Sequence, residues 1–179
     1  MGPRGARLGL HSRGVWDAPN LRAVAEDRHQ LGRFLSAQDP VYRAVLAELR
    51  AGEKVSHWMW FIFPQVEGLG RSQMARLFAI ASQAEAAAYA EHPVLGLRLR
   101  ECTRLILQAK GRPIEAILGG IDAMKFRSSM TLFARVAADN QPFLEALDEF
   151  FQGGEDPLTL ERIQSKEFQE GGRGTESRL

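Results

Sequence analysis

Apolar side chains recur every three or four positions along most of the chain, which is the spacing of one face of an α-helix. The clearest stretch is 94–109, where six apolar residues share one face and charged residues occupy the others. The same spacing predicts helices at 27–37, 40–50, 72–81, 83–91, 113–118, 121–137 and 142–151, with a last turn or two at 159–163. No long alternation of apolar and polar residues predicts a strand. The pattern therefore predicts an all-α fold, a compact single-domain bundle of about seven or eight helices with short loops.

Local signals predict where several of these helices begin and end. Asp39 followed by Pro40 is typical of a helix start, and Gly52 stands where a glycine stop is expected. Ser82 and Glu85 have the spacing of a capping box, which predicts a separate helix at this point.

The aromatic run 58–63 is the one segment whose type the pattern leaves open. Its aromatic and branched residues suit a buried strand as well as a buried helical turn. We favour the helical turn because a lone strand has no pairing partner. It should end before Pro64, since the residue preceding a proline is pushed out of the helical region.

Length and composition are those of one globular domain, with 179 residues, 45% hydrophobic content and 25% charged content. We expect 1–25 to be a flexible N-terminal extension, 26–165 a single globular helical domain, and 166–179 a disordered C-terminal tail. The net charge of +1 gives no strong nucleic-acid signal, although the arginine-rich extension offers a basic contact for an acidic partner as an alternative.

The cysteine content and the absence of membrane, secretion and metal-binding patterns predict the compartment and the cofactors of the protein. The chain has one cysteine, Cys102, no run of eighteen apolar residues and no secretory signal at its start, so we expect a cytoplasmic protein that makes no use of a membrane. The four histidines are far apart and no His-Glu-x-x-His or Cys-x-x-Cys spacing occurs. We therefore expect no metal and no cofactor, while the oligomeric state stays unknown.

The segment 56–72, reading SHWMWFIFPQVEGLGRS, concentrates residue types that are uncommon in a simple core segment. In one interpretation Trp58 and Trp60 form an aromatic platform for a planar ligand, with His57 as a catalytic proton donor and Gln65 as a further ligand contact. In the other interpretation the indoles fill the core and the histidine is satisfied by a carbonyl. The adjacency of the serine and histidine excludes a nucleophile–base pair, because their side chains diverge.

The end of that segment, Gly68-Leu69-Gly70-Arg71-Ser72, leads into a predicted helix. Free backbone N–H groups at a helix start, a serine cap and an adjacent arginine make a seat for a phosphate or carboxylate. The turn lacks the Lys-Ser/Thr pair of a P-loop and the G-x-G-x-x-G spacing of a dinucleotide turn. A glycine turn with an ordinary N-cap and a solvated Arg71 is the alternative.

The run DAMKFRSSMTLF is the third candidate. At helical spacing Asp122, Lys125 and Ser129 share one face, while Met124 and Leu132 belong to the opposite, apolar side. This polar stripe would suit an anionic or sugar-like ligand, with Asp122 as a catalytic candidate. A surface ion pair between Asp122 and Lys125 is the alternative.

These blocks carry a family resemblance. SHWMWFIFPQ, GLGRS, the pair His92-Pro93 followed by Leu95-Gly96, and DAMKFRSSMTLF together resemble the bacterial family catalogued as domain-of-unknown-function family 1810, over roughly 31–163. The resemblance implies a small cytoplasmic single-domain protein, and it transfers no catalytic residue. A fainter likeness, in the aromatic-histidine block and the lysine-containing helix, is to the ADP-ribose-related N-glycosidases.

Two classes of function follow from these residues. The first is an enzyme or binding domain for a nucleotide-like or ribosyl-phosphate molecule, in which a tryptophan stacks the planar group and Arg71 and Lys125 hold the anion. His57 or Asp122 would then move a proton. The second is a non-catalytic interaction module that docks a partner protein on its Trp-rich segment. Convergence of His57, Arg71 and Lys125 in one concave pocket would favour the first class.

Overall fold

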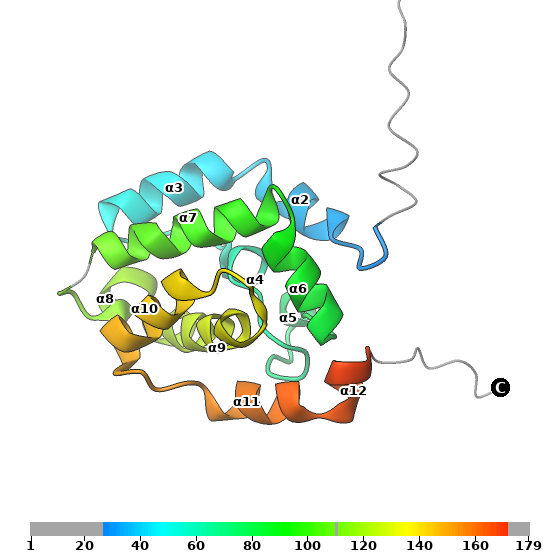
Figure 1. Cartoon of the computed structure of the whole chain (residues 1–179). Coiled ribbons are helices and arrows are strands. Elements are labelled where there is room, and N and C mark those ends of the chain that lie inside the picture. The colour runs from blue at the N-terminus through cyan, green and yellow to red at the C-terminus, as the bar shows by residue number, and fades with distance from the viewer. Residues whose placement is uncertain (1–26, 110, 172–179) are drawn as a thin grey trace, which may run out of the picture.

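The computed structural model describes residues 27–109 and 111–171, and these residues form eleven helices with no β-sheet (Figure 1). The prediction of an all-α fold is confirmed. The helices are α2 (Gly32–Gln38), α3 (Tyr42–Ala51), α4 (Met59–Ile62), α5 (Gln73–Leu77), α6 (Gln83–Glu91), α7 (Leu95–Gln108), α8 (Ile114–Leu118), α9 (Gly120–Val136), α10 (Gln141–Phe151), α11 (Pro157–Gln164) and α12 (Lys166–Glu170). Four of them have five residues or fewer, which explains why the count exceeds the expected seven or eight.

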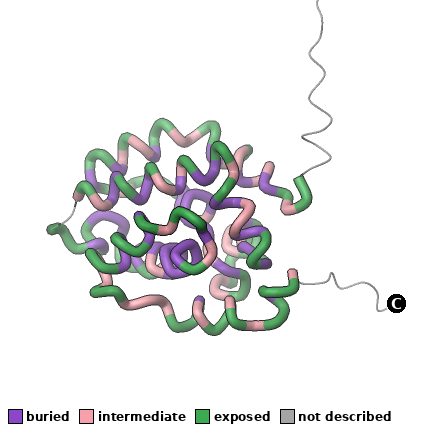
Figure 2. Tube along the Cα trace, in the orientation of Figure 1, coloured by how far each residue is buried: buried purple, intermediate pink, exposed green. Residues whose placement is uncertain are grey.

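The core is built around α9, which packs against α6, α8, α10 and α11 (Figure 1). Its residues Phe126, Met130 and Phe133 are fully buried at helical spacing. The long helix α7 packs against α3, α6 and α10, and its inner face is the apolar stripe that the sequence predicts. Figure 2 shows the buried residues following α9 and the inner side of α7. None of the described helices combines the length and apolar character needed to cross a membrane.

The aromatic run 58–63 forms a buried helical turn, α4, as predicted. Phe63 leaves the helical region directly before Pro64, as the residue preceding a proline should. The chain then pairs briefly with the segment before α6, since Ile80 N donates to Gln65 O at 2.9 Å and Glu67 N donates to Ile80 O at 2.9 Å. This bridge closes a loop that contains α5 and holds it beside α4.

Several helix ends confirm the local signals and two do not. Ser82 caps α6 by accepting from Glu85 N, and Gly52 ends α3 in the left-handed region. The first helix begins at 32 and not at 27, because the Asp27 carboxylate accepts from the backbone N–H groups at the start of α2 and holds 27–31 as a turn. Asp39 ends α2 and does not cap α3.

The expected boundary at 165 is wrong for the residues that follow it directly. Ser165 caps α12 by accepting from Phe168 N, and the Phe168 ring is buried in the core. One buried phenyl ring contributes about 2 kcal/mol, which favours an ordered helix at this point. The expected extension 1–25 and the tail beyond 171 lie outside the described residues.

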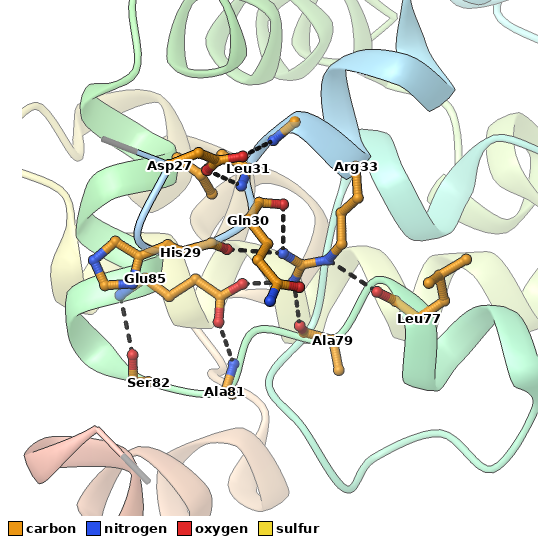
Figure 3. Close-up of polar contacts among 11 residues, drawn as sticks. Asp27, His29, Gln30, Leu31, Arg33, Leu77, Ala79, Ala81, Ser82 and Glu85 are labelled. Atoms are coloured by element: carbon orange, nitrogen blue, oxygen red, sulfur yellow. Dashed lines mark hydrogen bonds and ion pairs between the residues drawn. The ribbon is translucent and has the colours of Figure 1, made fainter. Parts of the chain in front are cut away.

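A polar cluster ties α2 to α6 (Figure 3). Arg33 donates to the Glu85 carboxylate at 2.5 Å, and Glu85 also accepts from Ala81 N at 2.8 Å. The remaining Arg33 N–H groups donate to the backbone carbonyls of His29, Gln30, Leu77 and Ala79. We call these residues the Arg33 cluster. It holds the segment between α5 and α6 in place, and with it one side of the loop that carries α5.

Candidate functional site

A pocket of about 530 Å³ opens between α4, the α5 loop and the first turns of α9 and α11. It is lined by Trp60, Gln65, Leu69, Gly70, Arg71, Ser72, Ala75, Ile121, Met124, Lys125, Ser128, Asp156 and Leu158. These residues come from three stretches that are far apart in the sequence.

Most of the ligand-binding residues predicted from the sequence meet in this pocket. They are Trp60, Gln65, Gly70, Arg71, Ser72 and Lys125. Arg71 and Lys125, which lie 54 positions apart, therefore line one concave site, but His57, the third residue of the convergence expected for the ligand-binding class, does not. The other candidates do not line it; they are His57, Trp58, Gly68, Asp122 and Ser129.

The two tryptophans of the aromatic block have different surroundings. Trp58 is 1% exposed, its ring centroid lies 6.3 Å from that of Phe63, and its Nε1 donates to Glu48 Oε2 at 2.8 Å. The core-filling interpretation therefore holds for Trp58. Trp60 is only partly buried and lines the pocket, so the platform interpretation stays open for this side chain alone.

Glu48 organises the turn before α4. Its carboxylate accepts from the backbone N–H groups of Val55 and Ser56, from the Ser56 hydroxyl and from Trp58 Nε1. Burial raises the pKa of Glu48, but these hydrogen bonds outweigh it and lower the pKa to about 2. His57 lies in this clamped turn and is exposed, away from the pocket lining. The sequence carries no signal for Glu48, because its partners come from a turn whose path is set by packing.

Lys125 joins the pocket to a small charged group. Its Nζ lies 4.4 Å from the Trp60 ring centroid and 2.7 Å from Asp122 Oδ1. The second carboxylate oxygen, Asp122 Oδ2, lies 2.7 Å from Lys54 Nζ. We call Lys54, Asp122 and Lys125 the Asp122 cluster. Their side chains are 8%, 16% and 21% exposed, so the group is largely withdrawn from water.

The ionisation of Asp122 follows from these contacts. Burial raises its pKa, but the hydrogen bonds and charges of Lys125 and Lys54 outweigh the burial and lower the pKa below its ordinary value. Asp122 is therefore a carboxylate at neutral pH and has no proton to donate. The expected ion pair with Lys125 is present, but it is part of a half-buried cluster and not a solvated surface pair.

The polar stripe expected on α9 is displaced around the helix. The residues of α9 that line the pocket are Ile121, Met124, Lys125 and Ser128. Ser129 is fully buried, and among the described residues no group hydrogen-bonds its hydroxyl. Met124, expected on the apolar side, is 65% exposed at the pocket.

The reason for the displacement is the core stripe of α9. Phe126, Met130 and Phe133 are spaced by four and three residues, and Ser129 completes the same face. A serine on that face is carried into the core by its large neighbours. This apolar spacing was visible in the sequence and could have assigned Ser128, not Ser129, to the site.

The glycine turn serves mainly to build the pocket wall. A Cβ at Gly70 would lie 2.4 Å from Ala75 Cβ, and Gly68 has φ +90° with the Arg162 guanidinium against it. Ser72 caps α5 by accepting from Ala75 N at 3.1 Å, as predicted. Helix α5 has only five residues, so its N-terminus is a weak site for an anion. The cationic side chain of Arg71 therefore attracts an anion more strongly than the backbone N–H groups of this helix.

Other reactive chemistry is not apparent in the described residues. Burial raises the pKa of Cys102 to about 12, so this thiol stays protonated and unreactive. Within 27–109 and 111–171 no three His, Cys, Asp or Glu residues are grouped so as to hold a metal ion.

Comparison with known proteins places the chain in a family. The model of the family "Protein of unknown function (DUF1810)" matches residues 28–163. The chain is also similar to the crystal structure of the conserved hypothetical protein Rv1873 from Mycobacterium tuberculosis, with 51% identity and a TM-score of 0.77. That match covers 78% of this chain and 100% of the mycobacterial chain. A search of curated proteins finds no match.

Proposed function

Because the chain belongs to the family "Protein of unknown function (DUF1810)", whose description states no activity, we propose a function from the pocket itself. The pocket binds a nucleotide-like or ribosyl-phosphate small molecule. Its volume of about 530 Å³ lies in the range of small-molecule sites.

One observation carries the proposal: Trp60, Arg71 and Lys125 line the same pocket although they come from separate segments. The indole of Trp60 offers an apolar, planar surface suited to a base or another flat group. The guanidinium and the ammonium supply charge-assisted hydrogen bonds for a phosphate. An aromatic surface with two cations in one concavity matches the chemistry of a nucleoside monophosphate.

The proposal is one of binding, and it assigns no acid or base. His57 lies outside the pocket lining, and Asp122 is held as a counter-ion by two lysines. A proton-transfer role needs a group within hydrogen-bond reach of the ligand and with a suitable pKa. Neither of the two residues singled out from the sequence combines both properties.

The mouth of the pocket supports a second candidate, a protein-interaction site. Ile121, Met124 and Leu158 are 70%, 65% and 60% exposed, which is unusual for large apolar side chains gathered in one place. These residues would receive an apolar side chain of a partner. We place this candidate second because it leaves the two cations of the concavity without a role.

Calorimetric titration with adenosine 5′-monophosphate and with ribose 5-phosphate measures binding, and unfolding with and without each compound measures the stabilisation that binding produces. At a ligand concentration of about 100 times Kd, binding raises the free energy of unfolding by about 2.7 kcal/mol. Joint substitution Arg71→Met and Lys125→Met should abolish this gain. The matched control is Arg43→Met with Lys166→Met, which removes two exposed cations outside the pocket lining. If neither compound binds the unmodified protein and apolar peptides bind at Met124, the second candidate is selected.

A further inference from the structure

Lys54 does not line the pocket, but it shares the Asp122 carboxylate with Lys125, which does. It lies before α4 in the sequence, its backbone N–H donates to Ile117 O at 2.8 Å, and its side chain is 8% exposed. Its Nζ lies 5.1 Å from the Trp58 ring centroid and 2.7 Å from Asp122 Oδ2. The backbone of Lys54 is therefore held by Ile117, and its ammonium by the Trp58 ring and the Asp122 carboxylate.

Asp122 divides its carboxylate between two lysines. One oxygen accepts from Lys125 and the other contacts Lys54, each at 2.7 Å. The Asp122 cluster therefore carries two positive charges and one negative charge. No second carboxylate of the described residues lies within ion-pair distance of Lys125.

We propose that Lys54 sets the anion affinity of the pocket by competing for Asp122 and so leaving Lys125 with uncompensated positive charge. This inference rests on the proposed function and names the group that is recognised, the phosphate of a nucleoside monophosphate. Without Lys54, Asp122 would neutralise Lys125 in full and the phosphate would gain little by binding there. Because the cluster is only half-buried, its surplus charge is partly screened but still acts at the neighbouring pocket.

Two other carboxylates near the site do not replace Asp122. Glu48 accepts four hydrogen bonds around the Trp58 turn, and its pKa of about 2 keeps it ionised at neutral pH. Asp156 lines the pocket, and its Oδ2 accepts from the backbone N–H and the hydroxyl of Thr159. Neither of them is within ion-pair distance of Lys54, whose partner is Asp122, so we expect differences between Lys54 variants to report on the sharing of Asp122.

The test compares adenosine 5′-monophosphate with adenosine, which presents the same base without the phosphate. Lys54→Met should lower the preference for the monophosphate by about tenfold, the size of one screened charge interaction in a half-buried site. Lys54→Arg keeps the positive charge and should retain the preference. Asp122→Asn should raise the preference, because both lysines then lose their counter-ion. Lys166→Met, which removes an exposed lysine of α12, is the matched control.

The outcomes separate the two proposals. If the unmodified protein binds no adenosine 5′-monophosphate, the proposed function and this inference are both overturned. If it binds and Lys54→Met leaves the preference for the monophosphate unchanged, this inference alone is overturned. If Lys54→Met does not fold, the Asp122→Asn variant decides, since an unchanged or lower preference there also overturns it.

Discussion

The Arg33 cluster and the Asp122 cluster are both built from cations and carboxylates, but their charges are balanced differently. In the Arg33 cluster one guanidinium meets one carboxylate and four backbone carbonyls, so its donors all have partners (Figure 3). In the Asp122 cluster two ammonium groups share one carboxylate beside an open pocket. A balanced cluster between backbone segments holds the fold together, whereas an unbalanced one beside a cavity is suited to bind an anion.

Trp58 and Trp60, two positions apart in the sequence, show the same contrast between a structural role and a role at the pocket. Trp58 is buried with its indole N–H bonded to Glu48, while Trp60 lines the pocket. Each has a lysine over its ring, Lys54 at 5.1 Å and Lys125 at 4.4 Å from the centroid. Both rings carry a lysine, so burial and the hydrogen bond to Glu48 distinguish the structural Trp58 from Trp60, which lines the pocket.

The largest effect on stability should come from the Arg33 cluster. Arg33→Met leaves the buried Glu85 carboxylate without its cation and should lower the free energy of unfolding by about 3 kcal/mol. Denaturant unfolding measures the loss, and Arg43→Met on the exposed side of α3 is the matched control. A loss no larger than that of the control would mean that the two clusters do not differ in their contribution to the fold.

A smaller effect is expected at the turn that buries Trp58. Glu48→Gln weakens four hydrogen bonds and should lower the free energy of unfolding by about 2 kcal/mol at neutral pH. The folded-state pKa of about 2 lies below the ordinary 4.5, so this contribution is present above about pH 4.5 and is lost as pH falls toward 2. Unfolding curves across that range should show the two proteins converging. A constant difference down to pH 2 would contradict this assignment.

Ser129 should show an effect of opposite sign. Ser129→Ala removes a buried hydroxyl that has no hydrogen-bond partner among the described residues, and it should raise the free energy of unfolding by about 1 kcal/mol. The neighbouring Ser128→Ala is the control, because the Ser128 hydroxyl donates to Met124 O and faces the pocket. Loss of ligand affinity in Ser129→Ala with none in Ser128→Ala would restore the stripe expected from the sequence.

The smallest change in stability is expected at Lys125. Lys125→Met removes one of two cations from Asp122 while Lys54 remains, so the free energy of unfolding should fall by less than about 1 kcal/mol. The affinity for adenosine 5′-monophosphate should fall at the same time. Paired unfolding and calorimetric measurements test this separation. A large loss of stability would place the Asp122 cluster with the Arg33 cluster as a structural element.

Helices and their ends were largely predictable, because the rules that produce them are local. The stripe at 94–109, the serine caps at Ser72 and Ser82, and the bounds of α6 all appear as predicted. Helix α12 was not predictable, because a short polar segment gives no local sign that Phe168 reaches the core.

The site was predictable in part for the same reason. Trp60 was marked by its aromatic block, Arg71 by the glycine turn before a helix and Lys125 by a polar helical stripe, and the structure brings them into one pocket. The partners Glu48 and Lys54 carry no such mark, because a single glutamate or lysine in a sequence looks like any solvated charge.

The sequence by itself determined the helical fold, most helix ends and the residue types available to a ligand, since these depend on spacing and on contacts within a few residues. Only the tertiary structure decided which tryptophan is buried, which serine of α9 faces the pocket and which lysines share Asp122. Those outcomes depend on how α9 is rotated against four neighbouring helices and on where the turn before α4 is held. Packing over the whole core sets that rotation, and no local pattern records it.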